Sequence, residues 1–306
     1  MLGNKYSQGE IARALGVAPS SISREIKRDG MTRHTYCAKR SQQHAEDSRP
    51  PSPSAVSNEV WSLVEVYLSD KQWSPEEISG FLKLNTSHRV SHEAIYLYIY
   101  RDKENGGDLY SHLRQKHRKR RRRKNTKDMR GQLKHRVPID ERPPEVDQKS
   151  RIGDLEMDTV IGLQGGPVLV TIVERVTKFT LIGLSPSKSA MDVGSTIYWL
   201  LYPFKDRIKT ATYDNGKEFA HHYLLNRLLE IDSYFARPYH SWERGLNENT
   251  NGLIRQYFPK KSDFSKLTDA DVKRVQDLLN SRPRKTLAFA TPNDKFLVQP
   301  TVALPS

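Results

Sequence analysis

The feature that most restricts how this chain can fold is RQKHRKRRRRK, residues 114–124, where nine of eleven positions are Lys or Arg. Like charges at this density repel one another and offer nothing apolar to bury, so the stretch cannot fold on itself. A chain of 306 residues with this interruption is expected to hold several domains rather than one compact globule. The stretch can lie along a phosphate backbone, with steeply salt-dependent binding, or serve as a solvated linker, and its position allows both.

The overall charge also indicates a polyanionic partner. Fifty Lys and Arg against 36 Asp and Glu leave a net charge of +14, which favours nucleic acid, although ribosome binding or plain solubility would fit the same charge. The single Cys37 excludes an internal disulfide and a cysteine-cluster metal site, so any metal needs oxygen or imidazole ligands. No apolar run reaches the roughly 20 residues of a membrane span. We therefore expect a cytoplasmic, nucleoid-associated protein with no membrane partner.

Residues 1–46 are predicted to form a helix-turn-helix module. Two short helical patterns meet at Gly16, with Val17 closing the turn, and their apolar positions share one face: Ile11, Ala12, Leu15, Ile22 and Ile26. This pattern favours DNA binding, with the second helix in a major groove, over an ordinary helical hairpin. The side chains expected to reach bases and phosphates are the polar and basic ones of the second helix: Ser20, Ser21, Ser23, Arg24, Lys27 and Arg28.

Residues 47–58 are rich in Pro and Ser and are predicted to be a linker, after which residues 59–105 are predicted to form a second helix-turn-helix-like module. Its second helix is expected to begin with Ser74 as N-cap, and its third with Ser91. Ser91 and His92 would then lie at the exposed start of the reading helix, where they would contact DNA. Three residues further along that helix could equally belong to the core: Tyr96, Tyr98 and Tyr100.

The rest of the chain is predicted to be a linker followed by an α/β domain. Residues 106–147 form the basic linker, whose phosphate contacts are expected from Arg118, Lys119, Arg120, Arg121, Arg122, Arg123 and Lys124. Residues 148–306 alternate strand and helix patterns in the order βββαβαβα, with a polar turn at 175–178 and Ser189 capping the first helix. This is the order of the ribonuclease H-like fold. The chain is therefore predicted to be multi-domain, with all-α helix-turn-helix modules before an α/β ribonuclease H-like domain.

Acidic residues mark the candidate chemistry of this last domain. GDLEMDTVIG alternates, so Asp154, Glu156 and Asp158 share one face of the first strand. The first and fourth strands are neighbours in this fold, so Asp158 and Asp214 could converge, and Glu248 on the last helix could complete the cluster. Hard oxygen ligands of this kind hold Mg²⁺ or Mn²⁺. Two such ions about 4 Å apart can activate an attacking hydroxyl and stabilise the leaving oxygen of a phosphodiester.

Simpler interpretations of these residues are also open. The DNG segment at Asp214 is a common turn motif. Asp154 and Glu156 rank below Asp158 because they could be solvated or paired with Arg151. The asparagines around Glu248 are either donors near DNA or ordinary surface residues. Basic side chains on or beside this helix are expected to bind phosphates: Arg244, Arg255 and Lys260.

The sequence resembles the transposases of the bacterial insertion sequence 30 family, in the DDE group of the retroviral-integrase superfamily. The segments that carry the resemblance span nearly the whole chain, among them ISREIKRDG, WSPEEISGFLK, YDNGKEF, HSWERGLNENTNGLIRQYFPK and NSRPRKTLAFATPNDKF. The resemblance implies that residues 148–306 are an integrase catalytic core in which Asp158, Asp214 and Glu248 hold two Mg²⁺ or Mn²⁺ ions. In this sequence 33 residues lie between Asp214 and Glu248, the spacing that the resemblance implies. It further implies metal-dependent cleavage and strand transfer by a homo-oligomer bound to double-stranded terminal inverted repeats and target DNA.

Two features depart from the family's pattern. Leu155 stands where the family has Trp and Met157 where it has Gly, and a side chain beside a metal ligand could crowd the site. The family also has a helix before YSQGEIARAL, which suggests a shortened N-terminus. These departures leave an alternative function, that of a decayed or truncated copy acting only as a sequence-specific DNA-binding repressor. A repair nuclease of ribonuclease H-like fold would explain the acids but not two DNA-reading modules.

Overall fold

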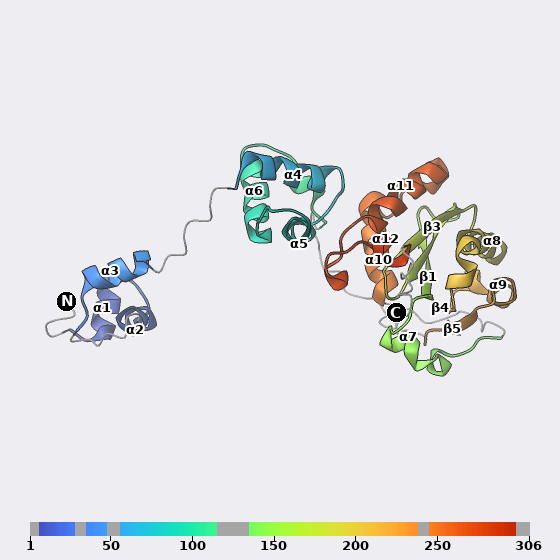
Figure 1. The fold of residues 1–306 in the computed structure, drawn as a ribbon, viewed down its shortest axis with the longest axis horizontal. Coiled ribbons are helices and arrows are strands. Elements are labelled where there is room, and N and C mark those ends of the chain that lie inside the picture. Colours follow the sequence, from blue (N-terminus) through green and yellow to red (C-terminus); the bar gives the residue numbers. More distant parts are fainter. Residues whose placement is uncertain (1–5, 28–34, 48–55, 115–134, 238–244, 298–306) are drawn as a thin grey trace, which may run out of the picture. The chain divides into compact units, whose positions relative to one another are not determined.

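The computed structural model describes residues 6–27, 35–47, 56–114, 135–237 and 245–297. The chain divides into two compact units, residues 1–61 and 62–306 (Figure 1). The second unit contains most of the predicted second module together with the α/β domain, so the finer boundaries at 105 and 147 stay predictions. None of the described helices is long and apolar enough to cross a membrane.

The first unit is a helix-turn-helix followed by a third helix. Its elements are α1 (Gln8–Leu15), α2 (Pro19–Lys27) and α3 (Ala38–Asp47). Ser7 caps α1 through reciprocal hydrogen bonds with Glu10, and Gly16 ends α1 in the left-handed conformation, with φ of 66°. The buried core consists of four of the predicted apolar residues: Ile11, Ala12, Ile22 and Ile26.

Two predicted core positions in this unit are wrong. Leu15 is 60% exposed and Val17 is 43% exposed, because the core closes around Ile11 and Ala12 and stops short of the turn. The sequence pattern also did not predict α3. Tyr36, two residues before α3, packs against the buried core, so the pair α1 and α2 gains its support from the chain that follows it.

Three further helices follow, α4 (Asn58–Ser69), which crosses the boundary between the units, and then α5 (Pro75–Asn85) and α6 (His92–Glu104) in the second unit. The predicted caps are confirmed, since Ser74 and Glu77 form a capping box at α5 and the Ser91 hydroxyl accepts from the Ala94 N–H at α6. The predicted tyrosines are not the core of α6. Its buried residues are Ile95 and Ile99, while Tyr100 is exposed.

The α/β domain contains one five-stranded sheet in the order β3-β2-β1-β4-β5. The strands are β1 (Asp154–Ile161), β2 (Val168–Glu174), β3 (Thr180–Ser185), β4 (Thr210–Tyr213) and β5 (Asp232–Phe235). The first three strands pair antiparallel, whereas β4 is parallel to both β1 and β5. The predicted ribonuclease H-like order is therefore confirmed.

Helices cover both faces of this sheet. On one face lie α8 (Ala190–Leu201), capped by Ser189 as predicted, and α9 (His222–Leu229). On the other face lie α10 (Gly245–Tyr257) and α11 (Asp269–Asn280). The remaining short helices are α7 (Pro144–Gln148), α12 (Pro292–Phe296), η1 (Leu109–His112), η2 (Ile139–Glu141), η3 (Tyr202–Arg207), η4 (Lys217–Phe219), η6 (Phe264–Lys266) and η7 (Lys285–Leu287).

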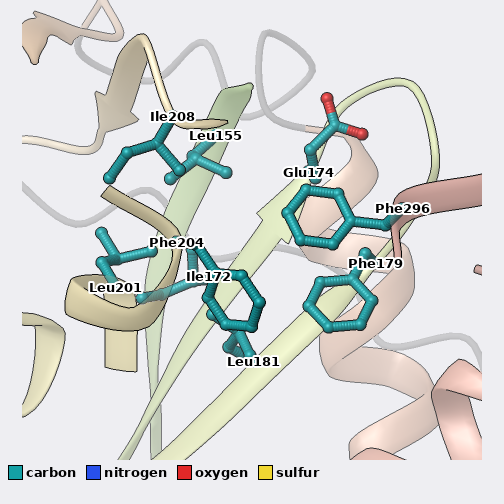
Figure 2. Close-up of a pocket in the computed structure, with 9 residues that line it drawn as sticks. All are labelled: Leu155, Ile172, Glu174, Phe179, Leu181, Leu201, Phe204, Ile208 and Phe296. Atoms are coloured by element: carbon teal, nitrogen blue, oxygen red, sulfur yellow. The ribbon is translucent and has the colours of Figure 1, made fainter. Parts of the chain in front are cut away.

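The core under α8 is packed almost without space. Figure 2 shows Leu155 of β1 among aliphatic and aromatic side chains, together with Glu174. The void that these residues line measures about 10 Å³. Phe296 of α12 closes this region by stacking on Phe179, with 4.3 Å between ring centroids. The position where the family has Trp is thus filled by ordinary apolar packing in this protein.

Both edges of the sheet are covered. On β3, the backbone N–H of Thr180 donates to Asn280 Oδ1 and that of Ile182 donates to Gln276 Oε1, both on α11, at 2.8 and 2.9 Å. On β5, the Phe235 N–H donates to the Val137 carbonyl at 3.0 Å. Side-chain amides and a short backbone bridge therefore satisfy edge groups that would otherwise be open to another strand.

Candidate active site

Asp158 lies within β1, and Asp214 directly follows β4, the neighbouring parallel strand. The parallel register of β1 and β4 pairs Asp154 with Thr210 and Glu156 with Thr212, and its continuation by two residues sets Asp158 opposite Asp214. Aligned residues of parallel strands point to the same face. Asp158 is the fifth residue of β1, three residues before its end, and Asp214 is the first residue after β4. Both residues are half-buried. The two residues therefore belong to adjacent parallel strands and the turn that follows, and their role as metal ligands stays a prediction.

The three acids of β1 differ in what they contact. Asp154 is buried and accepts hydrogen bonds from Arg151, as one interpretation predicted, and from the Thr210 hydroxyl at 2.8 Å. Glu156 is 3% exposed and accepts from Arg175 Nη1 at 2.8 Å. Only Asp158 is more open than these two. The prediction that it ranks above them agrees with this gradient, because the first two carboxylates are used inside the fold.

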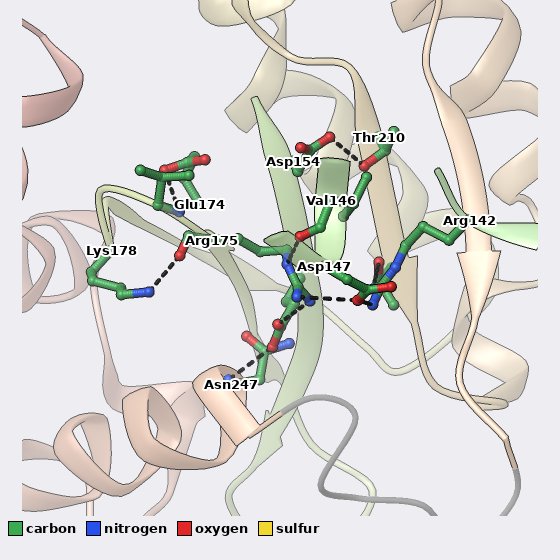
Figure 3. A network of polar contacts seen from close by, with 12 residues as sticks. Arg142, Val146, Asp147, Asp154, Glu174, Arg175, Lys178, Thr210 and Asn247 are labelled. Atoms are coloured by element: carbon green, nitrogen blue, oxygen red, sulfur yellow. Dashed lines mark hydrogen bonds and ion pairs between the residues drawn. The ribbon is translucent and has the colours of Figure 1, made fainter. Parts of the chain in front are cut away.

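A buried network around Arg175 ties Glu156 to two distant segments (Figure 3). Arg175 Nε donates to the Val146 carbonyl of α7 at 3.1 Å, and its Nη2 lies 3.7 Å from Asp147. Glu156 Oε2 accepts the Asn247 N–H, in the first turn of α10, at 3.3 Å. Burial lowers the pKa of the Arg175 guanidinium, and the Glu156 charge opposes that shift. The predicted turn at 175–178 forms, but its arginine is buried rather than solvated.

Asn251 and Asn247 of α10 face the acids. Asn251 Nδ2 donates to Asp158 Oδ2 at 2.9 Å, and Asn251 Oδ1 accepts from the Thr171 hydroxyl of β2 at 3.1 Å. Asn247 is fully buried beside Glu156, whereas Asn249 is exposed. The Asn251 side chain and the Asn247 backbone N–H thus hold α10 on the acidic face of the sheet, while DNA contact by these amides stays a prediction.

Glu248 lies on α10 beside the side of the helix that carries Asn247 and Asn251, and it is exposed. It shares its own side of the helix with Arg255, two helical turns further on, and Arg255 Nη2 donates to the Ile161 carbonyl at the end of β1 at 2.6 Å. Among the described residues, no three His, Cys, Asp or Glu side chains form a group that could hold a metal ion. The binding of a metal by Asp158, Asp214 and Glu248 therefore stays a prediction, with Glu248 exposed on the helix that covers the acidic face of the sheet.

The turn after β4 brings in an acid that the sequence reasoning missed. Asp214 Oδ1 accepts the Gly216 N–H at 2.8 Å, and Glu218 accepts from the Thr159 hydroxyl at 3.1 Å. A Cβ atom on Gly216 would lie 2.8 Å from Asp214 Oδ1 and 2.5 Å from the Glu218 carboxyl carbon. The carboxyl groups of Asp214 and Glu218 therefore both lie against Gly216, and a side chain there would require them to move. Glu218 is present in the segment YDNGKEF, but the sequence pattern alone assigned this residue no role.

Leu155 and Met157, which depart from the family's pattern, point away from the acids. Both are buried in the core on the α8 and α9 face of the sheet. Successive residues of a strand point to opposite faces, so the Met157 side chain does not lie beside the carboxylate of Asp158. The expected crowding of the site is absent, and with it the steric ground for a decayed copy.

The predicted DNA-contacting residues are placed as follows. On α2, Ser20, Ser21, Arg24 and Lys27 are exposed and Ser23 is half-buried, while Ser91 and His92 are exposed where α6 begins and Lys260 is exposed after α10. Arg255 is half-buried, and its guanidinium also approaches the carbonyls of Phe258 and Pro259. Arg28, Arg244 and the basic residues 118–124 lie outside the described residues. The DNA contacts of all of them stay predictions.

Comparison with known proteins agrees with this architecture. Residues 1–29 match a family described as a helix-turn-helix domain. The chain is 43% identical to the transposase for insertion sequence element IS4351 of Bacteroides fragilis, covering 97% of this chain and 91% of the relative. It is 37% identical to the transposase for IS1086 of Cupriavidus metallidurans, over 96% and 91% of the two chains. It is 35% identical to the transposase InsI for IS30A of Escherichia coli, over 99% and 81%.

The helix-turn-helix unit, the strand order and the acidic edge define a class, that of DNA-binding proteins with an integrase-type catalytic core of ribonuclease H-like fold. Among solved structures, the catalytic core domain of BIV integrase overlaps 47% of this chain and 93% of its own at a TM-score of 0.37 and 20% identity. The fold assignment rests on the sheet itself. The identity to full-length relatives is decisive for the family: this chain belongs to the insertion-sequence transposases of the IS30 type.

Proposed function

We propose that this protein is a metal-dependent DNA transposase that binds the terminal inverted repeats of its own insertion sequence and cleaves and transfers DNA strands. The observation that carries the proposal is the parallel register of β1 and β4, which pairs Glu156 with Thr212 and, continued by two residues, would set Asp158 opposite Asp214. Glu248 lies on the edge of the helix that covers this face. The relatives that match nearly the whole chain are named as transposases.

The donor set fits Mg²⁺ or Mn²⁺. All three proposed ligands, Asp158, Asp214 and Glu248, offer hard carboxylate oxygens, which these ions prefer. Bound there as a pair, the ions would supply Lewis acidity to both the attacking and the leaving oxygen of a phosphodiester. The chain orients the ligands itself, through the Asn251 amide on Asp158 and the Gly216 N–H on Asp214.

The proposed chemistry has two successive displacements at phosphorus. In the first, water attacks the phosphodiester at the repeat boundary, and the bond to the 3′ oxygen breaks to free a 3′ hydroxyl. In the second, that hydroxyl attacks a phosphodiester of the target DNA and joins the two strands. Neither step forms a covalent bond between DNA and the protein. The exposed polar face of α2 and the exposed Ser91 and His92 would select the repeat, and the basic run would bind its phosphates.

The proposal is tested with purified full-length protein at low salt. Labelled DNA carrying the ends that flank its gene is incubated with Mg²⁺ or Mn²⁺, beside the variants Asp214→Ala and Glu248→Ala. The matched control is Asp232→Ala. Asp232 is an exposed acid at the start of β5, at the end of the parallel strands opposite to Asp214. We expect nicking at the repeat boundary that requires metal, is lost in both test variants and persists in the control. Binding without nicking by the wild-type protein would instead favour the repressor.

A further inference from the structure

A lysine lies at the same edge of the sheet as the acids. Strand β2 is antiparallel to both β1 and β3, so β1, β3 and β4 run in one direction and end at one edge. Lys188 is in the loop between the end of β3 and α8. The topology therefore brings a cation from a separate segment to the place where Asp158 and Asp214 lie.

Two contacts at Glu218 tie this lysine to the segments that carry the aspartates. Lys188 Nζ lies 3.0 Å from Glu218 Oε1, and the same oxygen accepts from the Thr159 hydroxyl at 3.1 Å. Thr159 is the residue after Asp158. On the other side, the carboxyls of Glu218 and Asp214 both approach Gly216 so closely that a Cβ there would lie within 2.8 Å of each. Because successive residues of a strand point to opposite faces, the Thr159 hydroxyl does not lie beside the Asp158 carboxylate, so it is through Glu218 and Gly216 that the ammonium group is placed near Asp214.

The two members of this ion pair differ in access to solvent. The Glu218 side chain is 6% exposed, whereas the Lys188 side chain is 45% exposed. A lysine ammonium has three N–H donors, so a bond to Glu218 leaves donors that can be directed outward. An ion pair with one partner this exposed adds little to folding stability. The arrangement thus presents a positioned positive charge at the open side of the acidic edge.

We propose that Lys188 is a DNA-contacting residue of the active site, whose ammonium binds a phosphate oxygen of the strand that lies across Asp158 and Asp214. Glu218 and Thr159 are positioning residues that hold the ammonium in place. A compact point charge suits one non-bridging phosphate oxygen and needs no base recognition. The inference rests on the proposed function, because it takes the DNA strand to cross this edge. Its rival is a purely structural ion pair between the loop after β3 and the turn after β4.

Lysine acetylation followed by peptide mass spectrometry tests the contact directly. The full-length protein is acetylated with and without DNA carrying the ends that flank its gene, with Ca²⁺ as the ion because it takes the same oxygen ligands. Lys209 is the matched control, since it is exposed and directly precedes β4, at the opposite edge of the sheet. We expect DNA to protect Lys188 and to leave Lys209 reactive. Equal acetylation of Lys188 with and without saturating DNA would overturn the inference.

Substitutions provide the second measurement. Lys188→Ala should lower the slope of log affinity against log salt by about one, the loss expected for one phosphate contact. Lys188→Arg should keep that slope because it keeps the charge, and Lys209→Ala should leave it unchanged. If Lys188→Ala only lowers the melting temperature and the slope stays, the pair is structural and the inference is wrong.

The outcomes separate this inference from the proposed function. Nicking by the wild-type protein with no protection of Lys188 would refute the inference and leave the transposase proposal standing. Protection of Lys188 in a protein that binds but never nicks DNA would support the contact and refute the catalytic proposal.

Discussion

The two faces of strand β1 show how differently neighbouring residues can be constrained. On one face, Asp154, Glu156 and Asp158 each have particular polar partners from other elements. On the other face, Leu155 and Met157 are buried in the apolar core under α8 and α9. The five residues are consecutive, yet one face needs defined hydrogen bonds and the other needs only suitable volume.

This difference explains where the chain departs from its family's pattern. A hydrophobic core accepts other apolar side chains as long as the volume is filled, because its contacts are not directional. Replacing a buried carboxylate removes its hydrogen bonds and leaves its former cationic partner as an uncompensated buried charge. Both departures, Leu155 and Met157, fall on the tolerant face, and the acids of the intolerant face are all present.

The largest effect is expected on the acidic face. Asp158→Asn should lower the rate of nicking by about 10³-fold, because loss of a metal ligand removes several kcal/mol of stabilisation of the transition state. Its folding should change little, since the amide oxygen can still accept from Asn251. Single-turnover cleavage and thermal melting measure the two quantities. A residual rate within tenfold of the wild type would show that Asp158 is no ligand.

Restoring the family's glycine tests the opposite face. Met157→Gly should reduce the free energy of unfolding by about 4 kcal/mol, since it leaves a cavity and adds a flexible residue to a strand. The nicking rate per folded molecule should not rise, because this side chain points away from the acids. Urea denaturation and single-turnover cleavage provide the comparison. A faster and equally stable variant would mean that Met157 does crowd the site.

The middle acid should affect folding before chemistry. Glu156→Ala should lower the free energy of unfolding by about 3 kcal/mol, because Arg175 is left as a buried cation without its nearest partner. Glu145→Ala, which removes an exposed acid of α7, serves as the control and should stay within about 0.5 kcal/mol. Denaturant titration measures both. Equal stabilities for the two variants would show that the Glu156 ion pair is dispensable.

The smallest effect is expected at the helix that faces the acids. Asn251→Ala removes the amide donor from Asp158 and should slow nicking by about tenfold, the equivalent of one hydrogen bond to a charged group. Asn249→Ala, two residues away and exposed, should have no effect on the rate. Cleavage time courses under identical metal concentrations distinguish them. Identical rates for both variants would make the Asn251 contact incidental.

Local patterns in the sequence predicted the local structure well. The alternation in GDLEMDTVIG fixes which side chains share a face, and the N-caps Ser74, Ser91 and Ser189 follow from hydrogen bonds within one turn. The strand order also followed from the order of the elements. The DNA contacts and the metal ligands remain predictions, because each of them depends on a bound molecule or ion as well as on the protein.

What the sequence did not predict depends on contacts between distant segments. Arg175 is hydrophilic in any local window, yet Glu156 and α7 bury it. Glu218 and Lys188 meet only because two separate strands end at one edge of the sheet. Leu15 belongs to a correct helical pattern but lies beyond the reach of a very small core. In each case burial or proximity is set by tertiary packing that no periodicity reports.

Because α11 covers the edge of β3, truncated copies of the gene are expected to lose function in a particular way. A gene copy with a stop codon before Asp269 would make a chain without the amides of Gln276 and Asn280, and so with an unpaired strand edge. We expect such a product to self-associate and to be degraded rather than to compete for the repeats, and gel filtration of a chain ending at residue 268 would show this as loss of the monodisperse peak. A late truncation would then abolish the protein made by that gene copy, and the truncated product would not inhibit intact copies of the protein.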